Sequence, residues 1–178
     1  ALGVDGGGAV AERIAEFVRE HGGDYDRILA SQDWHRGDTD NGGHFAVPPA
    51  APDFVDTWPV HCEVGTPGAE LHPALEPVED RFDARFRKGQ FEAAYSGFEG
   101  VDEDGRTLAD ILSAAGIEAV DVVGLAESHC VKDTALDAVR QGYQVRVLTD
   151  LTEPVSPELG RAARADMSAA GIELVPSH

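Results

Sequence analysis

The chain has 178 residues, with 33 acidic against 14 basic side chains and a formal net charge of −19 at pH 7. This charge excludes nucleic acid as a partner, because binding to phosphate backbones depends on Lys and Arg. No apolar run approaches the roughly 20 residues that span a bilayer, and the first residues lack a signal-peptide pattern. We therefore expect no membrane association and a cytoplasmic location.

Helical periodicity appears first in residues 9–20, where apolar side chains recur at helical spacing before Gly22. A short apolar run at 27–31 is typical of a buried strand. From Gln32 to about Leu75 the chain is rich in Gly, Pro, Asp and His and shows no regular periodicity. Long structureless segments inside compact domains are usually functional, so the histidines of this segment become candidates for a site.

The rest of the chain alternates between strand and helix patterns. We expect further strands at 83–87, 120–125, 145–148 and 172–175, and further helices at 106–115, 129–140 and 157–170. Such alternation implies βαβ crossovers and a parallel sheet covered by helices on both faces. The predicted fold class is α/β, a single domain over 1–178 with three α/β/α layers and a central, mainly parallel sheet.

Parallel sheets bind ligands at the carboxyl ends of their strands, and here two reactive side chains follow such ends. Cys130 lies after 120–125 at the start of a helix, where the helix N-terminus lowers a thiol pKa and free N–H groups bind an oxyanion. Lys88 follows 83–87 and is one of two lysines in the chain. It is able to orient a nucleophile or to stabilise negative charge. Taken alone, a cysteine in such a place more commonly serves packing only. A lysine in such a place is more commonly a solvated surface charge.

A candidate metal site follows the strand at 27–31. Asp33 and His35 are two residues apart, so on an extended chain their side chains point the same way and reach one ion. His44 and His61 lie later in the same segment. Nitrogen and carboxylate ligands suit Zn²⁺, Fe²⁺ or Mn²⁺, although histidines in an acidic loop are also ordinary surface residues. For Cys62, beside His61, we favour a packing role.

Together these segments resemble the metal-dependent nicotinamidases of the isochorismatase-like hydrolase family. The similar stretches are ASQDWHRGDTDNGGHF, DTWPVHCEVGTPGAELHP, FRKGQFEAAYSGFEG and DVVGLAESHCVKDTALDAVRQG. They occur in the family's order and cover nearly the whole chain. The resemblance implies an isochorismatase-like fold and hydrolysis of nicotinamide, and also of pyrazinamide, to the acid and ammonia.

The resemblance also implies roles for individual residues. Cys130 would attack the carboxamide carbon to form a thioester, assisted by Lys88. A divalent metal ion, Zn or Fe/Mn, would be held by Asp33, His35 and His61, with His44 as an additional ligand, and would anchor the pyridine nitrogen. A cis peptide is expected just before Ala126, and the N–H groups of Ala126 and Cys130 would form the oxyanion hole. Trp58 and Tyr95 would line the ring pocket.

One family feature is missing from the sequence. The family's catalytic triad includes an aspartate at the end of a central first strand, in a D-x-Q-x-D-F motif that does not occur here. Asp5 falls where the family has a variable turn residue, so we give it no catalytic role. We expect that the natural protein carries a strand before Ala1, and that without it two sheet strands lack a partner and no general base is evident.

Two other functions fit the same motifs. One is a hydrolase or amidase of the same superfamily with a different small substrate, and the other is an inactive homologue that still binds metal. A nucleotide-binding protein is disfavoured, because Gly6-Gly7-Gly8 lacks the spacing of a phosphate-binding loop. The expected partner is a small-molecule substrate, and a homo-oligomer is compatible with the sequence.

Overall fold

Strands and helices alternate along residues 3–178, the part of the chain that the computed structural model describes, with a 3-10 helix in place of an α-helix between the first two strands. The strands are β1 (Leu29–Asp33), β2 (Ala84–Lys88), β3 (Ala119–Leu125), β4 (Gln144–Glu153) and β5 (Glu173–Val175). The α-helices are α1 (Gly7–His21), α2 (Leu108–Ala114), α3 (Lys132–Arg140) and α4 (Pro157–Ala169). Short 3-10 helices are η1 (Gly22–Asp24), η2 (Pro73–Arg81) and η3 (Gly97–Glu99), and η4 (Glu127–Val131) is a π-helical turn.

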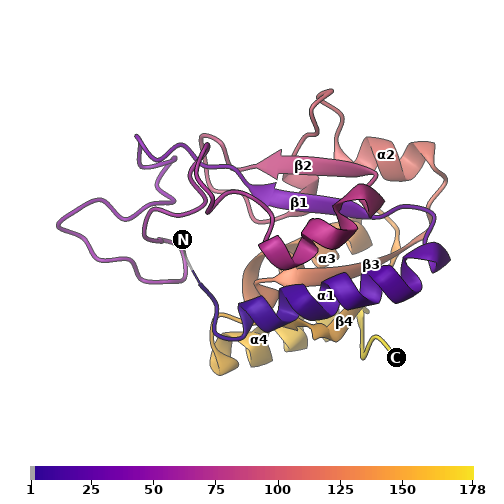
Figure 1. Ribbon diagram of the computed structural model, residues 1–178. Coiled ribbons are helices and arrows are strands. Elements are labelled where there is room, and N and C mark those ends of the chain that lie inside the picture. The colour runs from indigo at the N-terminus through magenta and orange to yellow at the C-terminus, as the bar shows by residue number, and fades with distance from the viewer. Residues whose placement is uncertain (1–2) are drawn as a thin grey trace.

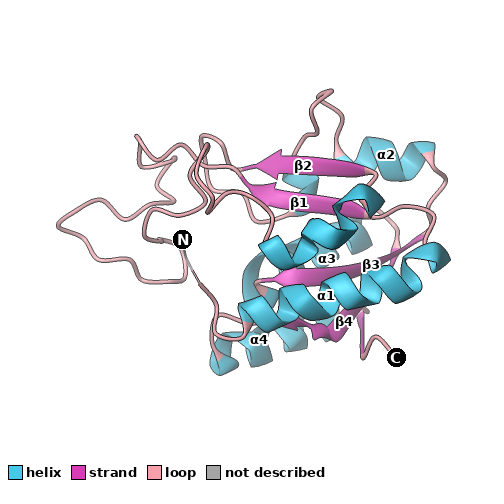
Figure 2. Cartoon of the chain, in the orientation of Figure 1, coloured by secondary structure: helices cyan, strands magenta, loops and turns pink. Residues whose placement is uncertain are grey.

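All strand pairings between these elements are parallel, and β1, β2 and β3 have their carboxyl ends on the side of the long loop (Figure 1). Helix α1 lies in front of the strands and packs against β3, β4 and η2, whereas α3 and α4 pack on the other side (Figure 2). The predicted three-layer α/β class is confirmed. No helix within residues 3–178 is long and apolar enough to cross a membrane.

The strands of the described chain form two separate sheets. One has the order β1-β2 and the other the order β3-β4-β5. A cavity of about 1000 Å³ is lined by residues of β1, β3 and α1. Among the described residues, β1 and β3 are therefore not joined by backbone hydrogen bonds, and the cavity lies between them.

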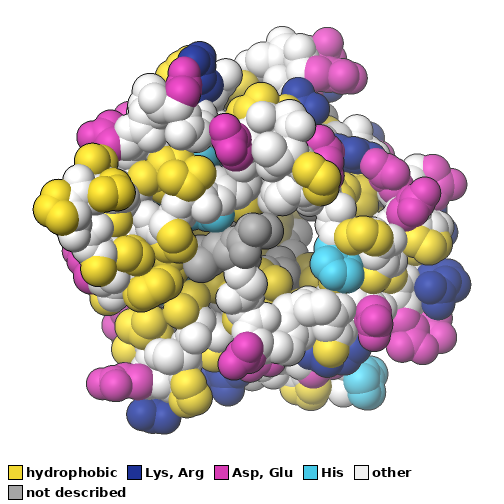
Figure 3. Space-filling model, turned by 60° about the vertical axis from the view of Figure 1, so that its left-hand side comes forward, with side chains coloured by type: hydrophobic (Ala, Val, Ile, Leu, Met, Phe, Trp, Pro, Cys, Tyr) yellow, Lys and Arg dark blue, Asp and Glu magenta, His cyan; other side chains and the backbone are white. Residues whose placement is uncertain are grey.

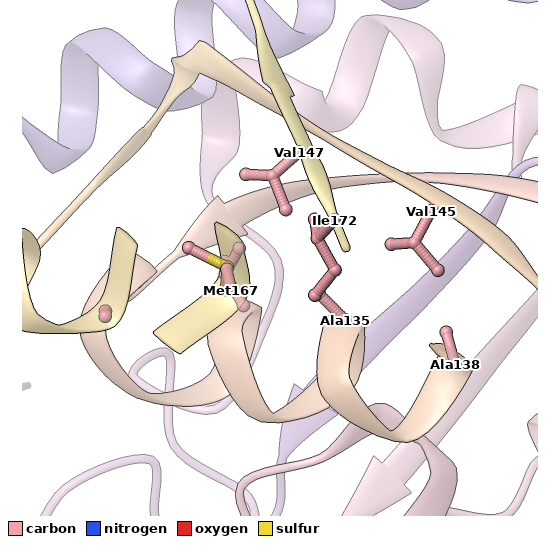
Figure 4. Close-up of a cluster of buried hydrophobic side chains, with 8 residues drawn as sticks. Ala135, Ala138, Val145, Val147, Met167 and Ile172 are labelled. Carbon is pink, nitrogen blue, oxygen red and sulfur yellow. The ribbon is translucent and has the colours of Figure 1, made fainter. Parts of the chain in front are cut away.

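The main hydrophobic core lies between α3, α4 and the sheet of β3, β4 and β5. Its buried side chains interdigitate from helix and strand (Figure 4): Val131, Ala135, Ala138, Val145, Val147, Ala163, Met167 and Ile172. The small alanines of α3 let this helix approach β4 closely, and Met167 of α4 adds a fully buried side chain to the same cluster. This packing supports η4, which precedes α3 directly.

Most predicted elements are present, with shifted ends. The strand predicted at 27–31 runs over Leu29–Asp33, and the strand predicted at 83–87 includes Lys88 as its last residue. The strand predicted at 145–148 extends to Glu153, because its polar second half still buries Leu151 and Thr152. Helix η2 was not predicted, since 3-10 turns lack the 3.6-residue period of an α-helix. The helix predicted at 129–140 instead begins with the π-helical turn.

Candidate active site

The ends of three strands bring Asp33, Lys88 and Cys130 together. Asp33 and Lys88 are the last residues of β1 and β2 and are directly paired in the parallel register. The Lys88 ammonium, buried at 4% exposure, donates hydrogen bonds to the Asp33 carboxylate, to the Ala94 carbonyl at 2.7 Å and to Cys130 Sγ at 3.6 Å. The structure thus places Lys88 beside the thiol, as the motifs predicted, and adds a contact with Asp33 that the motifs did not predict.

The electrostatics of this trio differ from the sequence-based expectation. Burial raises the pKa of the Cys130 thiol to about 11, and the nearby Lys88 charge offsets only part of this effect. The pKa of Cys130 thus lies above its ordinary value and not below it, as the position at a helix start had suggested, because desolvation outweighs the charge of Lys88. Burial would also raise the pKa of Asp33, but the charge and hydrogen bond of Lys88, followed by His35 and His61, lower it below its usual value.

Lys88 stays protonated in this environment. Burial acts to lower its pKa, but the charges of Cys130 and Asp33 raise it above the usual value for a lysine. The ammonium is therefore a fixed positive charge beside the sulfur atom. It is suited to stabilise a thiolate, and it is not suited to accept the thiol proton.

Three imidazoles meet in the loop between β1 and η2. The rings of His35, His44 and His61 have centroids 4.7 to 5.2 Å apart, and each ring offers a ligand atom within 4.8 Å of the others. All three side chains are buried. The Oδ2 atom of Asp33 lies 3.8 Å from His35 Nε2 and 4.0 Å from His61 Nε2. The structure brings together all four residues that the sequence predicted as metal ligands.

The ring nitrogens of this cluster fit a metal ion. His35 Nδ1 lies 2.6 Å from the Gly89 carbonyl, and His61 Nδ1 lies 2.8 Å from the Pro59 carbonyl, so their Nε2 atoms are left as acceptors. His35 Nε2 and His44 Nδ1 are buried without a hydrogen-bond partner. Burial, and then the neighbouring His35 and His61, lower the pKa of His44 to about 4. Unpaired, neutral imidazole nitrogens are the donor set that a divalent transition metal ion requires.

Cys62 also borders this cluster. Its position with Asp33 and His61 would allow a thiolate to bind an ion. Burial, followed by the Asp33 charge, raises the pKa of Cys62 to about 12, so the protonated thiol predominates near neutral pH. This agrees with the packing role favoured from the sequence.

A cluster of aromatic side chains adjoins the histidines, through Tyr95 beside His44 and Trp58 beside His61. The Trp58 indole donates a hydrogen bond of 3.0 Å to the Tyr95 hydroxyl, so the two predicted ring-binding residues are in contact. His129 completes the group, with ring centroids 5.0 Å from Trp58 and 5.8 Å from Tyr95. Its place directly before Cys130 in the sequence was the available signal, but sequence reasoning gave His129 no role. The loop face carries several exposed hydrophobic side chains (Figure 3): Val47, Phe54, Val55, Val60, Val64 and Phe91.

The turn that carries Cys130 begins with a cis peptide between Leu125 and Ala126, which confirms the expectation from the family resemblance. Within the turn the Ala126 carbonyl accepts hydrogen bonds from the N–H groups of His129 at 3.0 Å and Val131 at 3.2 Å. Ala126 and Cys130 are thereby held at one end of the same short turn. Their N–H groups remain predicted donors to an oxyanion.

Comparison with known proteins agrees with this geometry. The isochorismatase domain model matches residues 7–178. The chain is 46% identical to the nicotinamidase/pyrazinamidase of Mycobacterium tuberculosis over 99% of this chain and 90% of that protein, and 37% identical to the Escherichia coli nicotinamidase over 93% and 80%. The pyrazinamidase of Pyrococcus horikoshii in complex with zinc is similar in structure, with a TM-score of 0.78 at 32% identity, covering 99% of this chain and 89% of the other.

Proposed function

The chain belongs to the isochorismatase domain family, and from this premise we propose that it is a nicotinamidase that hydrolyses nicotinamide to nicotinic acid and ammonia and also accepts pyrazinamide. The observation that carries the proposal is the contact of Lys88 with both Cys130 and Asp33, next to a buried three-histidine cluster. The relatives named nicotinamidase support the same activity.

In the proposed reaction, the Cys130 sulfur attacks the carboxamide carbon, and a C–S bond forms while the C–N bond breaks. The amide nitrogen leaves as ammonia after gaining the proton that the Cys130 thiol loses, and water then cleaves the thioester to give nicotinic acid and the free thiol. The Lys88 ammonium stabilises the thiolate. The N–H groups of Ala126 and Cys130 bind the oxygen that becomes negative in each step.

The remaining residues orient the substrate. Trp58 and Tyr95, with His129 beside them, would supply the aromatic surface against which the substrate ring packs. Asp33, His35, His44 and His61 would hold a divalent ion, either zinc, as in the pyrazinamidase of P. horikoshii, or Fe/Mn. When bound, such an ion supplies a Lewis acid for the ring nitrogen of the substrate. A single domain over 1–178, a cytoplasmic location and association into a homo-oligomer remain predictions.

An ammonia-release assay tests the proposal. Nicotinamide and pyrazinamide are compared with benzamide, which carries the same carboxamide on a six-membered aromatic ring without nitrogen. We expect release from the first two substrates, a rate lower by about tenfold or more for benzamide, and none from a Cys130→Ala variant that still binds zinc. The matched control is Cys62→Ala, which should retain turnover.

Other results would identify the alternatives. Equal rates for nicotinamide and benzamide would indicate an amidase that does not recognise the ring nitrogen. Full zinc binding with no ammonia release from any of the amides would indicate an inactive metal-binding homologue.

A further inference from the structure

Glu127 is a buried carboxylate in the turn that carries Cys130, and the reaction above does not use it. Its side chain is fully buried, although it lies only three residues before the nucleophile. Burying a carboxylate is costly unless it is paired and hydrogen-bonded. Its partners therefore indicate what this residue does.

The Glu127 carboxylate joins three elements. Its Oε1 atom accepts a hydrogen bond from Arg164 Nε at 2.8 Å, and its Oε2 atom accepts from Arg164 Nη2 at 3.0 Å and from Thr152 Oγ1 at 2.6 Å. Arg164 comes from α4 and Thr152 from the end of β4. A bidentate guanidinium–carboxylate contact restricts the orientation of the two side chains as well as their distance. The turn η4 is therefore held against α4 and β4.

Two further observations show that η4 and α4 are closely fitted. A Cβ atom at Gly160, on α4, would lie 2.7 Å from Pro154 Cγ and 3.5 Å from Glu127 Oε1, so only glycine fits there without a shift. The Ser128 hydroxyl accepts a hydrogen bond of 3.1 Å from the Val155 N–H. The consecutive residues Glu127 and Ser128 are thus fixed by β4, α4 and the segment between them, and not by Lys88.

We propose that Glu127 and Arg164 are positioning residues that hold the nucleophile turn, so that the Cys130 sulfur and the N–H groups of Ala126 and Cys130 face the pocket. This inference rests on the proposed function in taking Cys130 as the nucleophile. Arg164 acts from outside the pocket: its side chain is about half exposed, at 47%, and contacts neither the histidine cluster nor Lys88 in the hydrogen bonds of the described chain. Displacing a reacting group by about 1 Å costs a large part of the rate.

The test compares Arg164→Ala with Arg161→Ala, an exposed arginine three residues earlier on the same helix. For Arg164→Ala we expect kcat for nicotinamide to fall by about tenfold to a hundredfold with KM changed little, since the ring pocket and the histidines are untouched. Arg161→Ala should match the unmodified protein. Millimolar guanidinium chloride should restore part of the lost kcat in Arg164→Ala, because the half-exposed site is open to a small cation, whereas equal sodium chloride should not.

Further variants keep the test decisive if Arg164→Ala does not fold. Arg164→Lys keeps the positive charge but loses the bidentate contact, and Glu127→Gln keeps the shape of the side chain but loses its charge. Each variant should show a smaller fall in kcat than Arg164→Ala. Folded Arg164→Ala with kcat within twofold of Arg161→Ala would overturn the proposal. Recovery of the melting temperature by guanidinium without recovery of kcat would also overturn it, because it would mean that the ion pair serves stability alone.

A readout independent of turnover separates this inference from the proposed function. Iodoacetamide labelling of Cys130, located by mass spectrometry, reports on the position of the thiol relative to Lys88. Arg164→Ala should slow labelling at a fixed pH compared with Arg161→Ala, even if the unmodified protein releases no ammonia. Absence of ammonia release with altered labelling refutes the nicotinamidase assignment alone, and unaltered labelling refutes the positioning role.

Discussion

At Cys130, burial and the charge of Lys88 act on the thiol in opposite directions. Desolvation dominates, and the thiol keeps its proton up to a pKa of about 11. The nucleophilic form is the thiolate, so at neutral pH only a small fraction of the protein molecules carries Cys130 in its reactive form. The reactivity of this residue therefore depends on pH over the whole alkaline range.

We predict that the rate constant for alkylation of Cys130 by iodoacetamide increases about tenfold per pH unit between about pH 7 and 10, because the thiolate fraction grows by that factor below the pKa. Lys88→Met should slow alkylation at each pH, since loss of the ammonium raises the thiol pKa further. Lys132→Met, which removes the other lysine of the chain, is the control. A rate that levels off below pH 9 would show that the thiol is activated in a way that its surroundings in this structure do not provide.

Gly89 supports the histidine cluster through its lack of a side chain. Its φ angle is +72°, and a Cβ atom there would lie 2.5 Å from His35 Cε1. Its carbonyl also accepts a hydrogen bond of 2.8 Å from the Asn41 amide, besides its contact with His35. The residue that follows the β2 strand thus determines where the His35 ring lies.

We predict that Gly89→Ala lowers zinc affinity by about tenfold to a hundredfold, the usual effect of disturbing a group that orients a metal ligand. Gly105→Ala is a matched control, because Gly105 has a similar φ of +78° and no atom within 4 Å of the added Cβ. Both variants should lose about 1–2 kcal/mol of stability from the positive φ. Equal zinc titration curves for the two variants would contradict the prediction.

At the scale of elements, hydrophobic periodicity was enough to locate α1, α2, α4 and most strands, because these elements bury one regular apolar face. The sequence motifs also identified Lys88 and Cys130, since Lys88 ends one strand and Cys130 follows the end of another. The π-helical turn η4 was not predicted, because its conformation depends on Glu127, Thr152 and Arg164, which are far apart in sequence. The Asp33–Lys88 contact likewise follows from strand register, which periodicity does not specify.

Met167 of the α4 helix has a fully buried side chain in the core cluster against the sheet. We predict that Met167→Ala lowers the free energy of unfolding by about 2–5 kcal/mol, from lost burial and the cavity left behind. Val60→Ala, at a side chain that is 52% exposed, should change it by less than about 0.5 kcal/mol. Urea denaturation followed by circular dichroism measures both, and similar midpoints would contradict the assigned core.

At the scale of the whole molecule, the net charge of −19 opposes compactness, because like charges repel across the surface. At 1 M ionic strength the screening length is about 3 Å, so repulsion between exposed charges farther apart than this is largely removed. The same salt also weakens exposed ion pairs such as Arg36–Asp38. With 33 acidic against 14 basic residues, relief of repulsion should outweigh the loss of such pairs, which are worth little at an exposed surface.

We therefore predict that the melting temperature at pH 7 rises as sodium chloride is increased to about 1 M, by ~2–4 °C for each 1 kcal/mol gained. Near pH 4.5, the sequence pI, net repulsion is small and the effect should nearly disappear. Scanning calorimetry at both pH values tests this. A melting temperature that falls with salt at pH 7 would mean that specific ion pairs outweigh general repulsion.

The absence of backbone hydrogen bonds between β1 and β3 among the described residues has a consequence for isotope exchange of the backbone. In a parallel sheet, successive amides of a strand point alternately to its two neighbours, and β3 has a neighbour on one side only among the described strands, whereas β4 lies between β3 and β5. Every second amide of β3 therefore faces the cavity. In deuterium oxide these amides should lose their protium well before the amides of β4, giving an alternating pattern of protection along Ala119–Leu125.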